Sequence, residues 1–258
     1  MEKIVRLTKE FFFTLSFYRN PFAYLKNRLG LSGVGKIILR LKNGINYCIN
    51  ANTTEMRVID EIWRVGVYDR LLTRIKENSI VIDIGANIGV FSVKAAEASK
   101  NVKVLSFEPF PRNFEMLKTN IALNKLEKRI QPFQAAVGQK GGKQTLFFRP
   151  GDSGGGSFKR YGNEAELSSV EVSTVTLEDI FSSNRIESCD FMKIDCEGAE
   201  EEILTTAPRD IFKKIRTMTI EWHYNLNRMT IDEFKLFLKN LGYNVDYNAS
   251  TLTLYAWQ

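Results

Sequence analysis

The chain has 258 residues, of which 44% are hydrophobic and 12% aromatic, and it carries a net charge of +6. This length and apolar content allow a substantial core, which excludes a disordered chain and fits one large α/β domain with an extension. The positive charge would suit nucleic acid, an anionic membrane or phosphorylated substrates. Scattered surface lysines that keep a protein soluble explain it more simply.

Three cysteines, Cys48, Cys189 and Cys196, show neither a disulfide framework nor a zinc-ligand spacing. They are expected to be buried, reduced thiols of a cytoplasmic protein. No secretory signal is expected, and the N-terminal apolar run at residues 11–18 is far shorter than the roughly 20 residues that span a bilayer.

The first 30 residues mix basic and aromatic side chains, a composition found in helices that lie on an anionic membrane. Helices that pack on the main domain and cover one mouth of its site explain it more simply. A weak membrane-surface contact, and with it a membrane-peripheral location, stays open as an alternative.

Residues 31–50 predict a β-hairpin, because the strand-like segments 36–41 and 45–49 flank Asn43-Gly44, a preferred two-residue turn. Apolar residues at helical spacing predict a helix over residues 54–68. We therefore divide the chain into an N-terminal extension of helices and a hairpin, residues 1–69, and a catalytic domain, residues 70–258.

The most informative stretch is residues 81–92, where a short apolar strand leads through a turn of small residues into a helix. Gly85 and Gly89 let a ligand and the next helix approach closely. A dinucleotide fingerprint needs a glycine where Asn87 stands, and Asp83 would turn a negative charge toward a diphosphate. The pattern favours a cationic ligand such as S-adenosylmethionine over a nicotinamide dinucleotide.

A second acidic residue follows the next predicted strand, residues 102–107. Glu108 stands at its carboxyl end, about 20 residues beyond the glycine turn, where a carboxylate can accept hydrogen bonds from both ribose hydroxyls. Glu108 therefore predicts adenosine binding, although it does not choose between the two cofactors.

Strands and helices alternate along the rest of the chain, which predicts a doubly wound, mainly parallel sheet. A capping box opens the helix after Thr230, and the last two strands are expected to pair antiparallel. The glycine-rich loop is interpreted as a mobile loop that borders the substrate, or as a long turn, because no Walker-type Lys-Ser/Thr follows it. The predicted elements are a helix around residues 114–121, strands at 130–137, 144–149 and 170–175 around the loop 151–157, and strands at 243–247 and 251–257.

Two further strands, residues 190–195 and 217–223, end in candidate catalytic groups. Ligands of doubly wound sheets bind beyond the carboxyl ends of the strands. Glu221 and His223 are two residues apart and project from one face. Asp195, Glu197, Glu221 and His223 are therefore expected to converge above the methyl donor.

His223 is the single histidine of the chain, and its ordinary pKa near ~6.5 suits a general base. We predict that it takes the proton of an acceptor hydroxyl while Glu221 or Asp195 positions it, with a structural histidine as the alternative. These groups also suit a divalent metal, but no tight ligand spacing favours one, so none is expected. Cys196 is interpreted as an inert thiol.

Several of these motifs, in this order, resemble the FkbM-type methyltransferase family over about residues 50–225. The resemblance implies a class I S-adenosylmethionine fold and methyl transfer to a hydroxyl, commonly on a sugar or a natural product. It assigns cofactor positions to Asp83, Gly85, Asn87, Gly89 and Glu108, and a second acidic signature to Asp195 and Glu197. The matching segments are residues 81–92, Phe107-Glu108-Pro109, 151–157, 192–200 and Glu221-Trp222-His223.

The sequence thus predicts an S-adenosylmethionine-dependent O-methyltransferase that acts on a hydroxyl of a small molecule, sugar or glycan. A nucleic-acid methyltransferase is the first alternative, but the chain lacks the Asn/Asp-Pro-Pro-aromatic motif and a basic stripe, so no nucleic-acid partner is expected. Asp83 and Asn87 argue against an oxidoreductase. A non-catalytic nucleotide-binding module shares the first turn and remains a further alternative.

Overall fold

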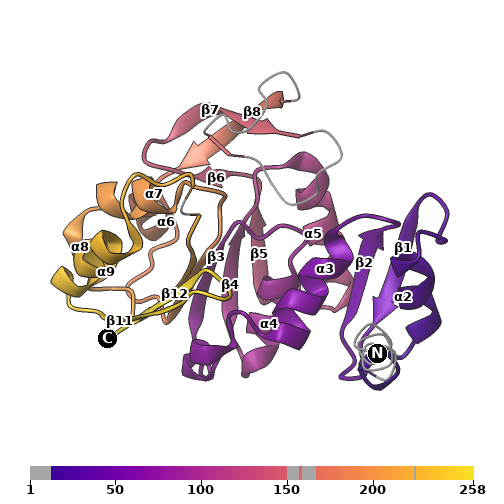
Figure 1. Cartoon of the computed structure of the whole chain (residues 1–258). Helices are drawn as coiled ribbons and strands as arrows, with labels where there is room; N and C mark the ends of the chain where they lie inside the picture. Colours follow the sequence, from indigo (N-terminus) through magenta and orange to yellow (C-terminus); the bar gives the residue numbers. More distant parts are fainter. Residues whose placement is uncertain (1–12, 150–156, 159–166, 224) are drawn as a thin grey trace.

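The structure is a computed structural model that describes residues 13–149, 157–158, 167–223 and 225–258. Its centre is a seven-stranded sheet of strand order β11-β12-β10-β9-β3-β4-β5 (Figure 1). Its strands are β3 (Ile80–Ile84), β4 (Lys103–Phe107), β5 (Ile130–Phe133), β9 (Phe191–Ile194), β10 (Thr217–Glu221), β11 (Asn244–Asn248) and β12 (Thr253–Trp257).

The five strands from β10 to β5 run parallel, whereas β12 is antiparallel to both β10 and β11. The predicted doubly wound, mainly parallel sheet with an antiparallel C-terminal pair is therefore confirmed. Every residue of β9 is buried, as expected of a parallel strand with both faces covered.

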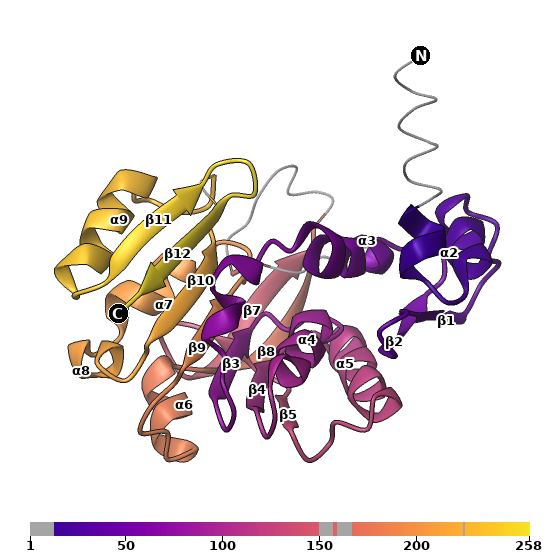
Figure 2. The same cartoon turned by 90° about the horizontal axis from the view of Figure 1, so that it is seen from below.

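Helices cover both faces of this sheet (Figures 1 and 2). On one face α4 (Val90–Ala98) and α5 (Pro111–Leu123) share a core with the extension. The other face carries α6 (Leu177–Ser183), α7 (Glu200–Thr206), α8 (Arg209–Phe212) and α9 (Ile231–Asn240). The predicted capping box is present, because the Thr230 side chain accepts a hydrogen bond from the amide of Glu233.

A small second sheet lies over the carboxyl ends of the parallel strands (Figure 1). It has the order β6-β8-β7, with β6 (Ala136–Val137), β7 (Gly142–Phe148) and β8 (Ser168–Val175). The single strand predicted at 130–137 is wrong, because the chain leaves the central sheet after β5 and pairs with β8 through β6. Residues 151–156 of the glycine-rich loop lie outside the described residues, so the prediction for that loop is not tested.

The extension contains the helix α2 (Pro21–Arg28) and the predicted hairpin of β1 (Lys36–Arg40) and β2 (Asn46–Asn50). Gly44 adopts φ +100° in its turn, a conformation that favours glycine. The helix expected over 54–68 is present as α3 (Glu55–Ile59), which continues into the π-helical turn η1 (Asp60–Val65). A 3₁₀ turn, η2 (Asp69–Arg74), then leads into β3.

Within the residues that the structure describes, no helix combines the length and the apolar character that a membrane crossing would require.

Candidate active site

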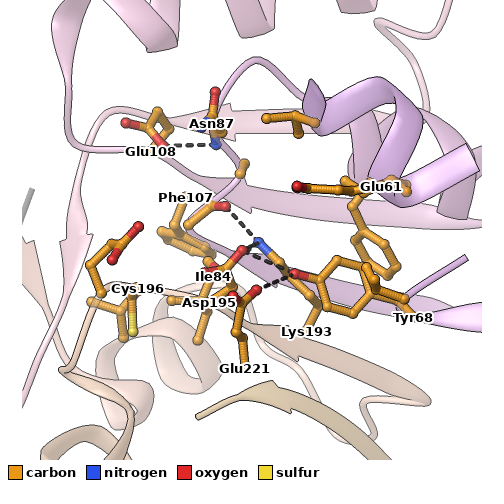
Figure 3. Close-up of a pocket in the computed structure, with 18 of the residues that line it drawn as sticks. Glu61, Tyr68, Ile84, Asn87, Phe107, Glu108, Lys193, Asp195, Cys196 and Glu221 are labelled. Carbon is orange, nitrogen blue, oxygen red and sulfur yellow. Dashed lines mark hydrogen bonds and ion pairs between the residues drawn. The ribbon is translucent and has the colours of Figure 1, made fainter. Parts of the chain in front are cut away.

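A cavity of about 460 Å³ opens at the carboxyl ends of β3, β4, β9 and β10, beneath the small sheet. Strand order reverses here, since β3 has β4 on one side and β9 on the other. Ligands of doubly wound folds bind at such a reversal, and this volume lies within the range of small-molecule sites. The cavity is therefore the candidate active site (Figure 3).

The turn after β3 forms one wall of the cavity through Gly85, Ala86 and Asn87. Gly85 has φ +76°, and a Cβ there would lie 1.7 Å from the carbonyl oxygen of Asp195. Only glycine fits this position, because any side chain would collide with the neighbouring backbone. The structure thus gives Gly85 a packing role against the Asp195 backbone, whereas its predicted close approach to a ligand stays a prediction.

Gly89 and Asp83 have other roles than the sequence suggests, since neither lines the cavity. Gly89, at φ +86°, precedes α4, and a Cβ there would lie 2.5 Å from Cδ1 of Leu117 in α5. Asp83 is fully buried, accepts a hydrogen bond of 2.5 Å from Ser92 and lies 3.4 Å from Nζ of Lys193. The expectation that Asp83 faces the ligand is corrected: its charge balances a buried lysine.

Glu108 lies where the sequence predicts, at the end of β4 and in the cavity wall. Its carboxyl oxygens accept hydrogen bonds from the backbone amides of Asn87 (2.8 Å) and Phe110 (3.0 Å). Burial raises the pKa of Glu108 to about 7, against the effect of these two bonds. The Asn113 side chain bonds to the same carboxyl group, so a diol would have to use the remaining lone pair or replace Asn113.

Next to the turn after β3, Tyr68, Lys193, Asp195 and Glu221 turn toward one another (Figure 3). The Tyr68 hydroxyl lies 3.0 Å from Oδ2 of Asp195 and 3.2 Å from Oε2 of Glu221. Lys193 donates to the carbonyl oxygen of Gly85 at 2.6 Å and lies 3.3 Å from Oδ2 of Asp195. One hydroxyl proton cannot serve both carboxylates at once, so the three acidic groups form one coupled proton network.

The two carboxyl groups of this network have opposite pKa shifts. Burial would raise the pKa of Asp195, but the adjacent Lys193 charge and the hydrogen bond from Tyr68 hold it below its ordinary value. Burial and the charge of Asp195 raise the pKa of Glu221 to about 8. Asp195 is therefore the permanent anion, and Glu221 is the group that exchanges a proton near neutral pH.

His223 joins the cluster through a second set of carboxylates. Its Nδ1 lies 2.7 Å from Oε1 of Glu200, while its Nε2 lies 3.4 Å from Glu197 and 3.9 Å from Glu221. The expected convergence of Asp195, Glu197, Glu221 and His223 is thus confirmed. The imidazole is held by Glu200, however, and not primarily by Glu221.

The pKa of His223 does not suit the role of general base that the sequence predicts. Burial alone would lower the pKa of His223, but the hydrogen bond and charge of Glu200, with the charges of Asp195 and Glu197, raise it to about 10. The imidazole therefore carries both protons at neutral pH and acts as a donor. A histidine in this state does not accept the proton of a hydroxyl.

Glu200 is a site residue that sequence reasoning placed only at a helix start. It is fully buried and accepts hydrogen bonds from the amides of Cys196 (3.2 Å) and Gly198 (3.0 Å). One carboxylate thus fixes both the turn after β9 and the ring of His223. Only the packed structure reveals this double role, because the turn and the histidine are separated by more than 20 residues.

Tyr68 and Lys193 were missed as site residues for different reasons. Tyr68 lies in the segment between η1 and η2, before the first strand of the sheet, and no local pattern marks it. Lys193 did carry a signal, since it is a charged residue inside the apolar run of β9. A lysine in a fully buried parallel strand requires paired anions, which Asp83 and Asp195 provide.

The cavity is acidic. Among its described lining residues Lys193 is the single cation, whereas the carboxyl groups belong to Glu61, Glu108, Asp195, Glu197 and Glu221. Such an excess attracts a cationic ligand and disfavours a diphosphate. The preference for a cationic ligand that the sequence analysis assigned to Asp83 stays a prediction for this cavity.

Asp195, Glu221 and His223 offer three ligand atoms within 4.8 Å of one another, a spacing that a metal ion could bridge. The negative charges of these possible metal ligands are already balanced, because His223 holds two protons and Lys193 lies beside Asp195. A metal would have to displace a proton and compete with an ammonium group.

All three cysteines are free, and Cys48 and Cys189 are buried as expected. Cys196 is partly exposed and lines the cavity, but burial of its sulfur and the charges of Glu200 and Asp195 raise its pKa well above the ordinary value. The thiol therefore stays protonated, which agrees with an unreactive role.

The sheet order and the acidic cavity at its reversal define a class I methyltransferase. Comparison with known families agrees, since the "Methyltransferase FkbM domain" model matches residues 83–245, which is more than half of the chain. The chain belongs to this family, and it is a methyltransferase.

Similar proteins carry related names. The "31-O-demethyl-FK506 methyltransferase FkbM" of Streptomyces tacrolimicus is 27% identical, over 72% of this chain and 81% of the relative. The "Hexuronic acid methyltransferase AglP" of Haloferax volcanii is 25% identical, over 57% of this chain and 60% of that protein. A solved structure of methyltransferase FkbM from Methylobacillus flagellatus is 18% identical, with a TM-score of 0.46, over 70% of this chain and 44% of that chain.

Proposed function

We propose that this methyltransferase uses S-adenosylmethionine to methylate a hydroxyl group of a sugar, a glycan or another small molecule. The observation that carries the proposal is the division of one cavity into two walls. Gly85, Asn87 and Glu108 form a wall suited to adenosine, and the Asp195–Glu221 pair forms a wall that can exchange a proton. The names of the two relatives, one for a demethylated natural product and one for a hexuronic acid, support an acceptor of this class.

We call the wall of Gly85, Asn87 and Glu108 the donor wall, and its residues suit the parts of S-adenosylmethionine. Glu108 would accept hydrogen bonds from the two ribose hydroxyls, and the absence of a side chain at Gly85 leaves room beside the turn. The acidic lining would stabilise the positive charge of the ligand. When bound, S-adenosylmethionine supplies a methyl group attached to a positively charged sulfur.

We call the wall formed by the Asp195–Glu221 pair the acceptor wall. There we propose that Glu221 is the general base, with Asp195 and His223 as its partners. The acceptor O–H bond would break and its proton would pass to the Glu221 carboxylate while the acceptor oxygen forms its new bond to the methyl carbon. The carbon–sulfur bond of the donor would break at the same time, its electron pair would stay on the sulfur, and S-adenosylhomocysteine would leave. Asp195 keeps the pKa of Glu221 near the working pH, where a base is most effective. The charge of the protonated His223, 3.4 Å from Glu197 and 3.9 Å from Glu221, would stabilise both carboxylates.

The proposal retains the three predicted catalytic residues but exchanges the roles of His223 and Glu221. The reason is the proton balance, since Glu221 titrates near neutral pH and His223 does not. We also propose that no metal takes part and that the enzyme works in the cytoplasm, in keeping with its free cysteines. The division into an extension, residues 1–69, and a catalytic domain, residues 70–258, is likewise a proposal, and Tyr68 joins the two parts.

Calorimetry with S-adenosylhomocysteine tests the donor wall. We expect the wild-type chain to bind this product analogue and not NADH. Glu108→Ala should weaken binding by about 10- to 100-fold, because two hydrogen bonds to a charged acceptor are lost. Glu115→Ala, which removes an exposed carboxylate of α5, is the control and should bind as the wild type does. Tight binding of NADH without binding of S-adenosylhomocysteine would refute the donor assignment.

The acceptor class is tested with an isotopically labelled methyl donor and fractionated cell extracts, followed by mass analysis of whatever gains one methyl group. An O-methylated sugar, glycan or small molecule is the expected product. Label found in RNA or DNA would contradict the proposal and favour the nucleic-acid alternative.

Tyr68→Phe tests the proton network through its pH dependence. The Tyr68 hydroxyl stabilises the ionised form of Glu221 and so lowers its pKa. Without it the rising limb of kcat against pH should move to higher pH, by about one unit for a hydrogen bond to a charged group. Tyr243→Phe is the control, because its hydroxyl bonds only to the carbonyl oxygens of Phe212 and Ile215. An unshifted profile in Tyr68→Phe would remove Tyr68 from the network.

A further inference from the structure

The positive charge of the chain is concentrated in one stretch. Residues 11–54 contain no aspartate or glutamate, whereas residues 55–258 hold nearly equal numbers of basic and acidic residues. The expectation of evenly scattered charge is therefore wrong. Six basic side chains lie in this stretch, and all six are exposed: Arg19, Lys26, Arg28, Lys36, Arg40 and Lys42.

The same stretch exposes apolar side chains. Phe22, Leu29, Leu31 and Val34 are 77%, 70%, 62% and 109% exposed. Single exposed apolar residues are common on protein surfaces, but four of this size within 13 residues mark an interaction surface. We call residues 19–42 the basic apolar surface.

Helix α2 is fixed so that it presents this surface outward. Its buried face holds Tyr24, whose hydroxyl donates to Asp60 at 2.6 Å, and Asn27. Phe22, Lys26 and Leu29 lie at positions i, i+4 and i+7, on the opposite side of the helix. An apolar stripe flanked by basic side chains thus points away from the protein.

The loop between α2 and β1 extends the same surface. A Cβ added at Gly30, Gly33 or Gly35 would meet no described atom within 4 Å, so this side of the loop is open. The loop is nevertheless anchored, because Asn52 donates to the carbonyl oxygen of Gly33 at 2.8 Å. Figure 2 shows α2 and β1 at one end of the molecule, far from α9.

We propose that the basic apolar surface binds an anionic membrane. Phe22, Leu29, Leu31 and Val34 would enter the interface between headgroups and acyl chains, and the basic side chains would contact the lipid phosphates. An anionic membrane is the favoured partner because its negative headgroups match the positive charge of this surface. A second copy of the chain would bring the same positive surface and be repelled, and nucleic acid offers no partner for the aliphatic side chains of Leu29, Leu31 and Val34.

Vesicle co-sedimentation of the full chain tests the proposal. The protein should bind vesicles of phosphatidylcholine mixed with phosphatidylglycerol, bind vesicles of phosphatidylcholine alone much more weakly, and dissociate as salt is raised. Leu31→Ser with Val34→Ser should reduce binding about tenfold or more, because two apolar side chains no longer leave water. Lys26→Glu with Lys36→Glu should cause a similar loss through charge.

Matched controls come from the far end of the molecule. Leu236→Ser removes an equally exposed apolar side chain from α9, and Lys213→Glu reverses an exposed lysine next to α8, so both should bind vesicles as the wild type does. Unchanged binding of S-adenosylhomocysteine shows that each variant is folded. The proposal is overturned if the wild type binds neither vesicle, if Leu31→Ser with Val34→Ser binds like the wild type, or if the surface variants instead abolish RNA binding or self-association.

Discussion

Glu221→Gln is expected to reduce kcat by about 10²- to 10⁴-fold, the usual contribution of a general base. The amide keeps the shape of the side chain and can still hydrogen-bond with the hydroxyl of Tyr68, but it cannot take up a proton. In the wild type kcat should rise with pH through about 8, because only the ionised form of Glu221 is a base. In Glu221→Gln this limb should disappear.

Two measurements separate this role from a structural one. Glu221→Gln should bind S-adenosylhomocysteine within a few-fold of the wild type, because the adenosine wall around Glu108 is intact. His223→Gln should lower kcat yet keep a rising limb, since Glu221 still titrates. If His223→Gln removes the limb and Glu221→Gln keeps it, the base is His223, as the sequence alone predicts.

Gly85→Ala is expected to have the largest effect of any single-methyl change in the donor wall. The added Cβ would lie 1.7 Å from the carbonyl oxygen of Asp195, so the turn after β3 and the end of β9 must move apart. Overpacking of this kind costs about 1–3 kcal/mol or more. We expect S-adenosylhomocysteine to bind at least about tenfold more weakly, because each ~1.4 kcal/mol is a factor of ten.

Gly30→Ala provides the matched control for Gly85→Ala. Gly30 has φ +71°, close to the φ +76° of Gly85, but within the described residues no atom beyond its chain neighbours lies within 4 Å of the added Cβ. Both variants therefore carry the same backbone cost, about 1–2 kcal/mol, and only Gly85→Ala adds a collision. Urea unfolding should show a clearly larger loss for Gly85→Ala. Equal stability and unimpaired donor binding in both variants would contradict the close approach at Gly85.

The proton balance of the site changes how its histidine is interpreted. A lone histidine at a strand end suggests a base when only its ordinary pKa is considered. Glu197 and Glu200 surround it, and each of these carboxylates favours the protonated ring. Glu221 lies between the anion Asp195 and an apolar environment, so it becomes the weaker acid. Neighbouring charges, and not residue type, decide which group exchanges the proton.

Local patterns account for what could be predicted of the fold. Strand, turn and helix follow one another at 81–92 and again at 190–200, and the local pattern of residues predicts these elements. The prediction at 130–137 was wrong because the local pattern of strand-forming residues does not reveal where a chain changes sheets. That choice depends on β8, which lies more than 30 residues further along the chain.

The sequence by itself indicated the doubly wound, mainly parallel sheet and the family. It also indicated Gly85, Asn87 and Glu108, the residues of the donor wall that we propose, because they act through backbone conformation and strand ends that are encoded locally. Only the tertiary structure decided the acceptor wall. Tyr68, Lys193 and Glu200 come from separate elements, and their effect on Glu221 and His223 is electrostatic. Such an effect depends on distance in space and on burial, which the order of residues along the chain does not specify.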